Sequence, residues 1–589
     1  MCGIFTLLNS SNCNINFIQN EFMKGRNRGP EFSKLSLDYI KIILGFHRLA
    51  INGLNEASNQ PLVINDIVLI CNGEIYNYKT LYKYMNVKPI TGSDCEVIIH
   101  LYIKYGIEQT LTMLDGVFSF VLYDNRITND LNNKIYIARD PYGVRPLYYL
   151  KQIGNETQLN KLYGFASELK CIEKIYNIEN QNNKQNKCIV EQFKPGTYSI
   201  FNLSNKISCC WVPISENTPY FLPSFSYSNI RLDNEMITKS NTTNCYDDFA
   251  NAISHSLQNS VNKRCLTTER PIACLLSGGL DSSLIAALVS NYYKKNNILT
   301  PLETYSIGLQ ESEDLKYAKV VAEWIESKHT EIIVSEKDMF DAIPEVIYAI
   351  ESYDTTTVRA SIGNYLLGKY ISSNSDAKVI FNGDGSDELF GGYLYMNNCP
   401  DDIEFDKETR RLLKDIYLFD VLRSDKSISS HGLEPRTPFL DRTFVNLVLS
   451  LPPYYRNHKN FDATEKYILR KGFCHDNIQY DYKPILNNKG KQLLPDSILF
   501  RKKEAFSDGV SSKGRSLYLI LHEFISAELN IEENTDKYKP CIETEKYYYK
   551  KIFEGYYPNC SHILPYFWMP KYTDAKDPSA RTLNIYKDT

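Results

Sequence analysis

The sequence lacks the features that mark membrane-spanning, secreted and zinc-binding proteins. No apolar run approaches the ~20 residues that a bilayer span requires, and no charged segment followed by an apolar core opens the chain. Its 15 cysteines form no Cys-x-x-Cys pair, and its nine histidines show no paired ligand spacing. We therefore expect a cytoplasmic protein with free thiols and no membrane partner.

A strong excess of charge of either sign is also missing. The chain carries 66 Lys and Arg against 70 Asp and Glu, a formal net charge of −4 at pH 7. This balance gives no electrostatic argument for nucleic acid as a partner. We expect small-molecule substrates instead.

The length of the chain and its apolar content predict two domains. The chain has 589 residues, 43% of them hydrophobic, which is enough for two cores, since one domain takes ~100–250 residues. We expect a first domain over residues 2–213, a linker over 214–243, a second domain over 244–515 and a C-terminal extension over 516–589. The Asn-rich stretch 177–187 is expected to be a surface loop.

Cys2 is a candidate nucleophile because it directly follows the initiator Met1. Removal of Met1 would give Cys2 a free α-amine, whose pKa of ~7.7–8.0 suits it to accept the thiol proton. Amide hydrolysis is the natural use of such a pair. The alternative is that the chain starts Met-Cys by chance.

Polar residues of the next hundred positions could form a glutamine pocket. Arg48 offers a guanidinium fork for an α-carboxylate, and Asp94 offers a carboxylate for an α-ammonium. Asn72 can donate to an oxyanion through its side-chain amide, and Gly73 through an unobstructed backbone N–H. Each residue alone also fits a turn or a solvated surface charge.

Taken together, these motifs resemble the glutaminase domain of the class II, N-terminal-nucleophile glutamine amidotransferases. The resemblance rests on residues 45–50, 71–77, 91–96, 138–147 and 165–168. It implies that glutamine is bound by Arg48, Asn72, Gly73, Glu74 and Asp94. Phe118, Phe120 and Leu122 alternate with small or polar residues, which is typical of strands. We expect an α+β domain of two packed antiparallel sheets with helices.

A second motif begins where the apolar run 271–276 ends. Ser277-Gly278-Gly279-Leu280-Asp281-Ser282-Ser283 follows it, and an apolar helical pattern comes next. Glycine backbone N–H groups, serine hydroxyls and a helix N-terminus together suit a pyrophosphate. The loop lacks the Walker lysine and resembles the pyrophosphatase-type loop of adenylating enzymes. A plain Gly-Ser turn is the alternative.

The residues around this loop indicate a doubly wound parallel sheet. Residues 304–308 and 332–334 have strand patterns, and residues 317–326 between them have a helical one. Ligands of such sheets lie beyond the carboxyl ends of the strands. Leu276 and Ile307 are therefore candidate walls for adenine, although either could be an ordinary core residue.

A third motif, Asn382-Gly383-Asp384-Gly385-Ser386-Asp387-Glu388, again follows a strand pattern and is acidic. Because Mg²⁺ prefers carboxylates and substrate phosphates, Asp281 and Asp387 are the candidate magnesium ligands. Calcium is the competing hypothesis, but the spacing is not that of an EF-hand.

With residues 354–361, 432–441, 501–509 and 577–581, this motif resembles the family of glutamine-hydrolysing asparagine synthetases. That resemblance implies adenylation of aspartate by ATP and attack by ammonia released from glutamine. It assigns catalysis to Cys2, Asn72, Gly73, Lys503 and Glu388. It assigns ATP binding to Leu276, Ser277, Gly278, Gly279, Leu280, Asp281, Ser282, Ser283, Ile307, Asn382 and Gly383. It assigns aspartate and pyrophosphate to Arg359, Asp384, Glu388 and Lys503.

One departure from the family pattern keeps other functions open. Asp384 stands where the family usually carries glutamate, and a reacting group misplaced by about 1 Å can cost ~10²-fold in rate. A related amidotransferase or cyclising adenylase that acts on another carboxylate is one alternative. A catalytically silent nucleotide-binding scaffold is the other. Homodimers are common in the resembled family, so a homodimer is a further expectation.

Overall fold

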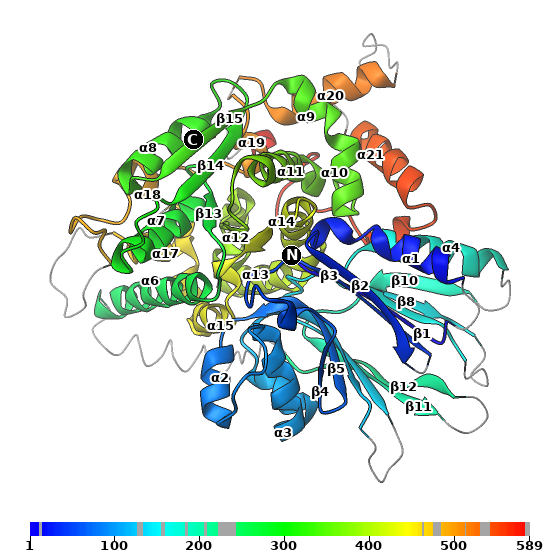
Figure 1. The fold of residues 1–589 in the computed structure, drawn as a ribbon. Coiled ribbons are helices and arrows are strands. Elements are labelled where there is room, and N and C mark those ends of the chain that lie inside the picture. The colour runs from blue at the N-terminus through cyan, green and yellow to red at the C-terminus, as the bar shows by residue number, and fades with distance from the viewer. Residues whose placement is uncertain are drawn as a thin grey trace.

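The computed structural model describes residues 1–10, 14–39, 41–126, 133–154, 160–182, 187–204, 209–221, 243–461, 464–474, 485–512, 514–529 and 542–583. These residues form two antiparallel sheets from the N-terminal part and one parallel sheet from the rest of the chain (Figure 1). None of the helices they form has the length and apolar character needed to cross a membrane.

The two antiparallel sheets have six strands each. The first has the order β10 (Cys188–Gln192), β8 (Tyr148–Gln152), β9 (Tyr163–Ala166), β1 (Gly3–Leu8), β3 (Ile42–Arg48) and β2 (Phe32–Tyr39). The second has the order β12 (Cys210–Pro219), β11 (Thr197–Ser204), β7 (Lys134–Arg139), β6 (Gly116–Asp124), β5 (Ile67–Ile75) and β4 (Leu62–Ile64).

These two sheets pack face to face, as predicted. Ile4 and Leu8 of β1 join the core between the sheets, whereas Phe5 and Leu7 contribute to the core on the outer face, where α1 (Ile15–Met23) packs. This alternation follows from the two-residue period of a strand. The outer face of the second sheet is covered by α2 (Tyr78–Met85) and α3 (Val97–Met113).

The predicted alternation in β6 is confirmed. Phe118, Phe120 and Leu122 face α2 and α3, whereas Val121 and Tyr123 face the first sheet. At the end of this half, β12 pairs with β11 as far as Pro219, so the second sheet continues beyond the boundary expected at residue 213. Most of the expected linker, residues 222–242, lies outside the described residues.

The third sheet is parallel, with the order β15 (Lys328–Ile333), β14 (Glu303–Gly308), β13 (Ile272–Leu275), β16 (Val379–Phe381) and β17 (Glu434–Arg436). β14 and β15 extend to one side of β13, and β16 and β17 extend to the other. The strand order therefore reverses between β13 and β16, and a crevice opens at the carboxyl ends of such a pair.

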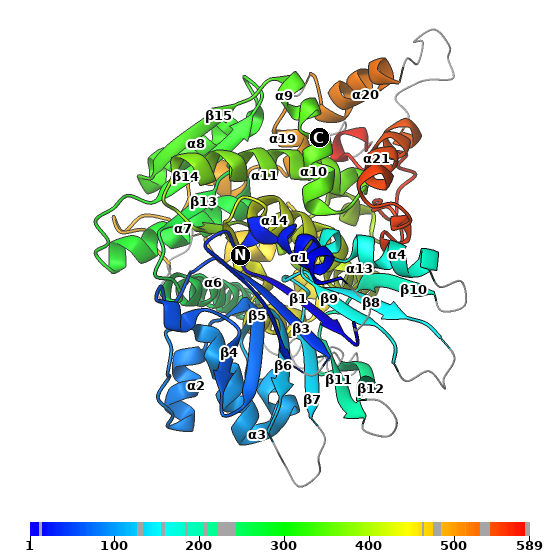
Figure 2. The ribbon, with the colours of Figure 1, turned by 45° about the vertical axis from the view of Figure 1, so that its right-hand side comes forward.

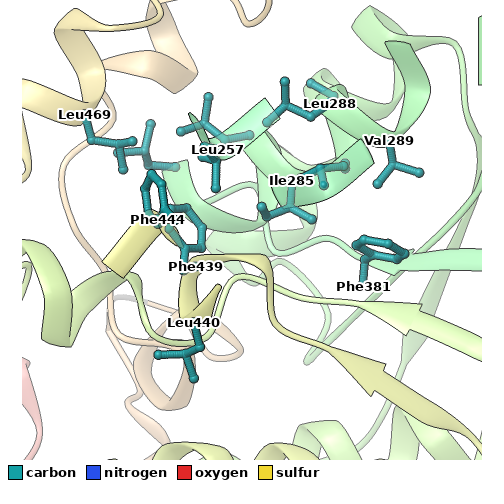
Figure 3. Packing of buried hydrophobic residues seen from close by; sticks show 14 of the residues in the cluster. Leu257, Ile285, Leu288, Val289, Phe381, Phe439, Leu440, Phe444 and Leu469 are labelled. Carbon is teal, nitrogen blue, oxygen red and sulfur yellow. The ribbon is translucent and has the colours of Figure 1, made fainter. Parts of the chain in front are cut away.

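Helices cover both faces of the parallel sheet, which confirms the doubly wound fold. One face packs on α6 (Thr243–Leu266), α7 (Leu280–Lys295) and α8 (Glu313–Ile325). Leu257, Ile285, Phe381 and Phe444 meet in that core (Figure 3). The opposite face packs on α11 (Thr355–Asn374) and α14 (Asp420–Ser429).

The C-terminal part does not form a separate body. Helices α20 (Leu517–Glu528) and α21 (Ile542–Tyr556) pack on α10 (Ile343–Ile350), in a core that also includes residues of the first sheet. Figures 1 and 2 both show α21 beside α4 (Glu173–Asn182) and α10. Within the stretch 177–187, residues 177–182 form the end of α4 and not a loop. Ile175 and Tyr176, which directly precede them in α4, are buried and hold the helix against the core.

The remaining α-helices of the described residues are α9 (Glu336–Asp341), α12 (Ser386–Phe390), α13 (Asp402–Asp415), α15 (Arg442–Ser450), α16 (Pro453–Arg456), α17 (Tyr467–Lys471), α18 (Asp496–Leu499) and α19 (Phe506–Gly509).

Candidate functional site

Cys2 immediately precedes β1, at the contact between the antiparallel sheets and the rest of the chain. The Met1 amino group donates to the carbonyl of Leu433 at 3.1 Å, and Arg28 Nε donates to the carbonyl of Cys2 at 2.9 Å. The Cys2 thiol donates to the carbonyl of Leu49 at 3.6 Å. Burial raises the pKa of the Cys2 thiol to about 11 and lowers the pKa of the Met1 amine to about 5. With Met1 in place the thiol is therefore neutral at pH 7, and the free α-amine that could act as its base belongs to Met1 and not to Cys2.

Asn72 and Gly73 are adjacent on β5, which contacts β1, the strand that begins directly after Cys2. The Ser167 hydroxyl joins the two strands, since it accepts from the Ile4 backbone N–H at 3.0 Å and lies 3.4 Å from the Asn72 side-chain nitrogen. A Cβ on Gly73 would lie 2.6 Å from the carbonyl of Val117, so only glycine fits there. Both predicted oxyanion donors therefore belong to one rigid strand.

Arg48 ends β3 with its guanidinium in a cradle of neutral acceptors. It donates to the Asn59 side chain at 2.7 Å and to the carbonyls of Asn55, Asn52 and Gly53. Burial lowers the pKa of Arg48. Because these hydrogen bonds orient the guanidinium without neutralising it, its charge remains suited to a ligand carboxylate.

Asp94 and Glu74 place two carboxyl groups beside Gly73. Asp94 accepts from the Ile75 backbone N–H at 2.7 Å, and Glu74 accepts from Asn52 at 2.8 Å. Burial raises the pKa of Asp94 to about 6. A ligand ammonium would favour the charged form of this carboxyl group.

The second site is a pocket at the carboxyl ends of β13 and β16, where the strand order reverses. In its phosphate loop, Gly278 has φ +72°, and a Cβ there would lie 2.4 Å from the backbone nitrogen of Ala318. The Ser282 hydroxyl accepts from the Ser277 N–H at 3.2 Å. The buried Ser283 hydroxyl has no partner within the part of the chain that the structure describes. Loop and helix start thus present the donors that an anion needs.

The other nucleotide-binding candidates surround the loop. Leu276 and Ile307 are buried and line the pocket, as do Asn382 and Gly383. A Cβ on Gly383 would lie 2.8 Å from the Cβ of Asp281, so glycine lets the acidic turn approach the phosphate loop.

Two carboxylates and two ammonium groups meet between these turns. Lys466 lies 2.5 Å from Asp281 and 2.6 Å from Asp387, and Lys503 lies 2.6 Å from Asp387 and 3.9 Å from Asp281. The two lysines hold the pKa of Asp387 below its usual range, and the two carboxylates hold that of Lys503 above it.

A further set of charged groups lies at the other end of the pocket. Arg423 lies 3.1 Å from Asp384 and 2.8 Å from Asp420, and the Tyr393 hydroxyl donates to Glu388 at 2.5 Å. Burial raises the pKa of Asp384, and burial with the neighbouring carboxyl groups raises that of Glu388. Such a set can recognise a ligand that carries both a carboxylate and an ammonium.

The two sites are joined by buried ion pairs. Asp425 lies 2.7 Å from Arg28 and 3.2 Å from Arg145, and Arg436 at the end of β17 lies 3.3 Å from Glu74 of the first site. The elements that form one site therefore contact the elements that form the other.

Two family models match this sequence. The model described as asparagine synthase matches residues 252–403 and 397–562, and the model described as a glutamine amidotransferase domain matches residues 1–218. The chain belongs to the asparagine synthase family. The second match ends within β12, in agreement with the continuation of the second sheet beyond residue 213.

Relatives of this asparagine synthase family member match over its full length. It is 41% identical to asparagine synthetase (glutamine-hydrolyzing) of Gallus gallus over 602 residues, which cover 100% of this chain and 99% of that relative. The proteins of the same name from Bos taurus and Homo sapiens are 39% and 38% identical, with the same coverage. A solved NMN synthetase of Francisella tularensis matches with TM-score 0.23 and 12% identity, over 55% of this chain and 98% of that one.

Three predicted residues of the synthetase site are absent from the pocket lining of this family member: Gly278, Ser283 and Arg359. Arg359 is held by other side chains. Its guanidinium binds Glu545 at 2.8 and 2.5 Å and Asp577 at 2.8 Å through each of two nitrogens. Both carboxylates come from the C-terminal part of the chain. The neighbouring Thr356 and Thr357 line the pocket instead.

The pocket-lining residues that sequence reasoning missed include Lys466, Tyr393, Asp420, Arg423 and Trp568. Tyr393 directly follows Gly391 and Gly392 at the end of the glycine-rich acidic segment, whereas the other four lie in no such motif. Asp420 and Arg423 have the i, i+3 spacing of an ordinary helical ion pair, which in sequence is indistinguishable from a solvated one.

Proposed function

We propose that this chain makes asparagine from aspartate, ATP and glutamine. The observation that carries the proposal is the presence of two candidate sites in one chain. In one of them Ser167 links the strand after Cys2 to Asn72, and in the other a phosphate loop lies beside paired lysines. The full-length similarity to asparagine synthetases supports the same conclusion.

The first reaction is hydrolysis of glutamine. After removal of Met1, the Cys2 amine takes the thiol proton and the sulfur attacks the carboxamide carbon. Asn72 and Gly73 donate to the oxyanion, the C–N bond breaks, and ammonia leaves with the proton. Water then hydrolyses the thioester to glutamate, with Arg48 and Asp94 holding the two ends of the amino acid.

The second reaction is adenylation of aspartate. A side-chain carboxylate oxygen attacks the α-phosphorus of ATP, and the bond from that phosphorus to the bridging oxygen breaks, which releases pyrophosphate. Lys466 and Lys503 stabilise the charge that accumulates on the leaving group. The N–H groups of the phosphate loop hold the same phosphates.

Mg²⁺ fits this arrangement, because it commonly takes one or two carboxylates together with substrate phosphates. Asp281 and Asp387 would hold it, and the ion would neutralise phosphate charge.

Ammonia then attacks the carbonyl carbon of the aspartyl-adenylate, the C–O bond breaks, and asparagine and AMP leave. Glu388 is positioned to take a proton from the attacking nitrogen. Arg423 would bind the α-carboxylate of aspartate, and Asp384 with Asp420 its α-ammonium. Asp384 has a shorter side chain than the glutamate that the family usually carries, and its carboxylate contacts Arg423 directly.

The test measures pyrophosphate release by purified, Met1-free protein with ATP and Mg²⁺, with aspartate and glutamine each omitted in turn. Equal amounts of pyrophosphate and asparagine, the latter identified by mass, are expected. Glutamate and ammonia without aspartate-dependent pyrophosphate would instead indicate another acceptor carboxylate, and absence of both would indicate a silent scaffold.

A cytoplasmic location and a homodimer complete the proposal. The cysteines of the described residues are free thiols, which suits a reducing compartment. The homodimer rests on the family resemblance, and light scattering of the purified protein tests it.

A further inference from the structure

The C-terminal tail, defined here as residues 564–583, returns to the pocket of the parallel sheet. Trp568 lines that pocket and is 7% exposed. Its ring lies 5.3 Å from that of Tyr393 and 6.1 Å from that of Tyr395, measured between centroids. The Tyr393 hydroxyl donates to Glu388, so Trp568 packs on a residue that orients one of the acidic groups proposed to bind aspartate. We name this part of the pocket, with Asp384, Glu388, Asp420 and Arg423, the acceptor end.

The tail is fixed to the start of α11. The backbone N–H of Trp568 donates to Asp354 at 2.8 Å, and the other oxygen of Asp354 caps α11 by accepting from the Thr357 N–H at 2.9 Å. One carboxylate therefore positions both Trp568 and a helix turn that lines the pocket.

Arg359, one turn further along α11, holds the tail a second time. Its guanidinium binds Asp577 of the tail and Glu545 of α21 at the same time, and the arginine is 4% exposed. Breaking one partner of such a buried set leaves a charge without compensation. We name Arg359, Asp577 and Glu545 the tail clamp.

The tail also reaches the loop that carries Lys503. The Ser579 hydroxyl donates to Asp508 at 2.7 Å, and Arg581 donates to the carbonyl of Ser512 at 2.7 Å. The tail thus links α11 to α19 and to Ser512, which follow Lys503 closely in the chain.

We propose that the tail is a working part of the synthetase site, in which Trp568 forms the wall of the acceptor end and Arg359 is a positioning residue. This inference rests on the proposed function. Arg359 then acts through Asp577 and Glu545, not on the phosphates. A closed wall excludes water, which would otherwise attack the carbonyl of the adenylate and return aspartate and AMP.

The experiment compares Asp577→Asn, Glu545→Gln, Arg359→Lys and Trp568→Ala with wild type. Glu543→Gln, on the same helix with a side chain 70% exposed, is the matched control. The measurements are the KM for aspartate, the KM for ATP, and the moles of pyrophosphate released per mole of asparagine. The rate of glutamine hydrolysis reports whether each variant is folded.

Each tail variant is expected to raise the KM for aspartate by about tenfold or more and to raise the pyrophosphate to asparagine ratio above that of wild type. Trp568→Phe should change the KM for aspartate and the pyrophosphate to asparagine ratio less than Trp568→Ala does, because phenylalanine still covers most of the pocket wall. Arg359→Lys combined with Asp577→Asn should raise the KM for aspartate no more than either substitution alone, because both substitutions break the same tail clamp.

The inference is overturned if Asp577→Asn and Glu545→Gln behave like Glu543→Gln while Arg359→Lys alone abolishes pyrophosphate release, since Arg359 would then act on phosphate. It is also overturned if Trp568→Ala leaves the ratio and both KM values unchanged. Failure of the proposed function is recognised separately, because wild type itself would then release no pyrophosphate with aspartate.

Discussion

Lys466 donates to Asp281 at 2.5 Å and thereby connects the segment before α17 to the phosphate loop. The lysine side chain is 1% exposed, and a Cβ on Gly392 would lie 1.9 Å from its Cε. Its ammonium has little room to move. This contact identifies a charge of the synthetase site that no sequence motif indicates.

Lys466→Met should abolish most pyrophosphate release, because the leaving group loses one of two nearby cations; removal of one such electrostatic contact typically costs ~10²–10³-fold. Initial rates with aspartate and ATP measure the loss. Lys471→Met on α17 is the control, since its ammonium lies 3.9 Å from Asp247, away from the pocket. Equal rates for the two variants would remove Lys466 from the mechanism.

Cys2 should be unreactive while Met1 is retained. With a pKa of about 11 the thiol loses its proton only above neutral pH, so roughly one molecule in ten thousand is thiolate at pH 7. Protein made with an aminopeptidase inhibitor should therefore resist iodoacetamide at position 2, and processed protein should be alkylated. Mass analysis of the N-terminal peptide measures both, and equal alkylation would contradict the prediction.

Arg423→Lys should raise the KM for aspartate far more than the KM for ATP, because a lysine cannot reproduce the fork that meets Asp384 and Asp420. A change of about tenfold or more is expected from the loss of a bidentate contact. Arg411→Lys on α13, one-third exposed and paired with Glu408, serves as the control. A parallel rise in both KM values would indicate a general distortion instead.

Asp94→Asn should lose glutamine hydrolysis and yet stabilise the empty protein at neutral pH. The folded pKa of about 6 lies above the unfolded value, so the folded state is penalised once the carboxyl ionises, by about 3 kcal/mol at pH 8 and roughly half of that at pH 5. Below both pKa values the penalty vanishes. Unfolding free energies of variant and wild type should therefore diverge as pH rises from 5 to 8, and a constant difference would refute this.

The features that sequence predicted are local ones. The phosphate loop and the pair Asn72 and Gly73 each lie on one short segment, where residue order dictates strand, turn and helix start. The doubly wound sheet follows from the same local patterns. Sequence also placed Asp281 and Asp387 together correctly, since each follows a strand that ends at the same edge of the sheet.

The features that sequence missed depend on distant segments. Arg359 meets partners 186 and 218 positions away, and no pattern near it announces Glu545 or Asp577. Trp568 lies in a stretch without regular structure and reaches the pocket only because the chain returns. Local composition likewise misassigned the Asn-rich stretch after residue 177, where packing of Ile175 and Tyr176 supports a helix.

The burial of Met1 sets the order of events in the life of the chain. Its side chain is 1% exposed and its amino group is hydrogen-bonded to Leu433, far along the sequence. An aminopeptidase needs an accessible terminus, whereas the terminus of the folded chain is buried. We therefore expect Met1 to be removed before the N-terminus packs against Leu433, and a chain that folds with Met1 in place to lack the catalytic amine.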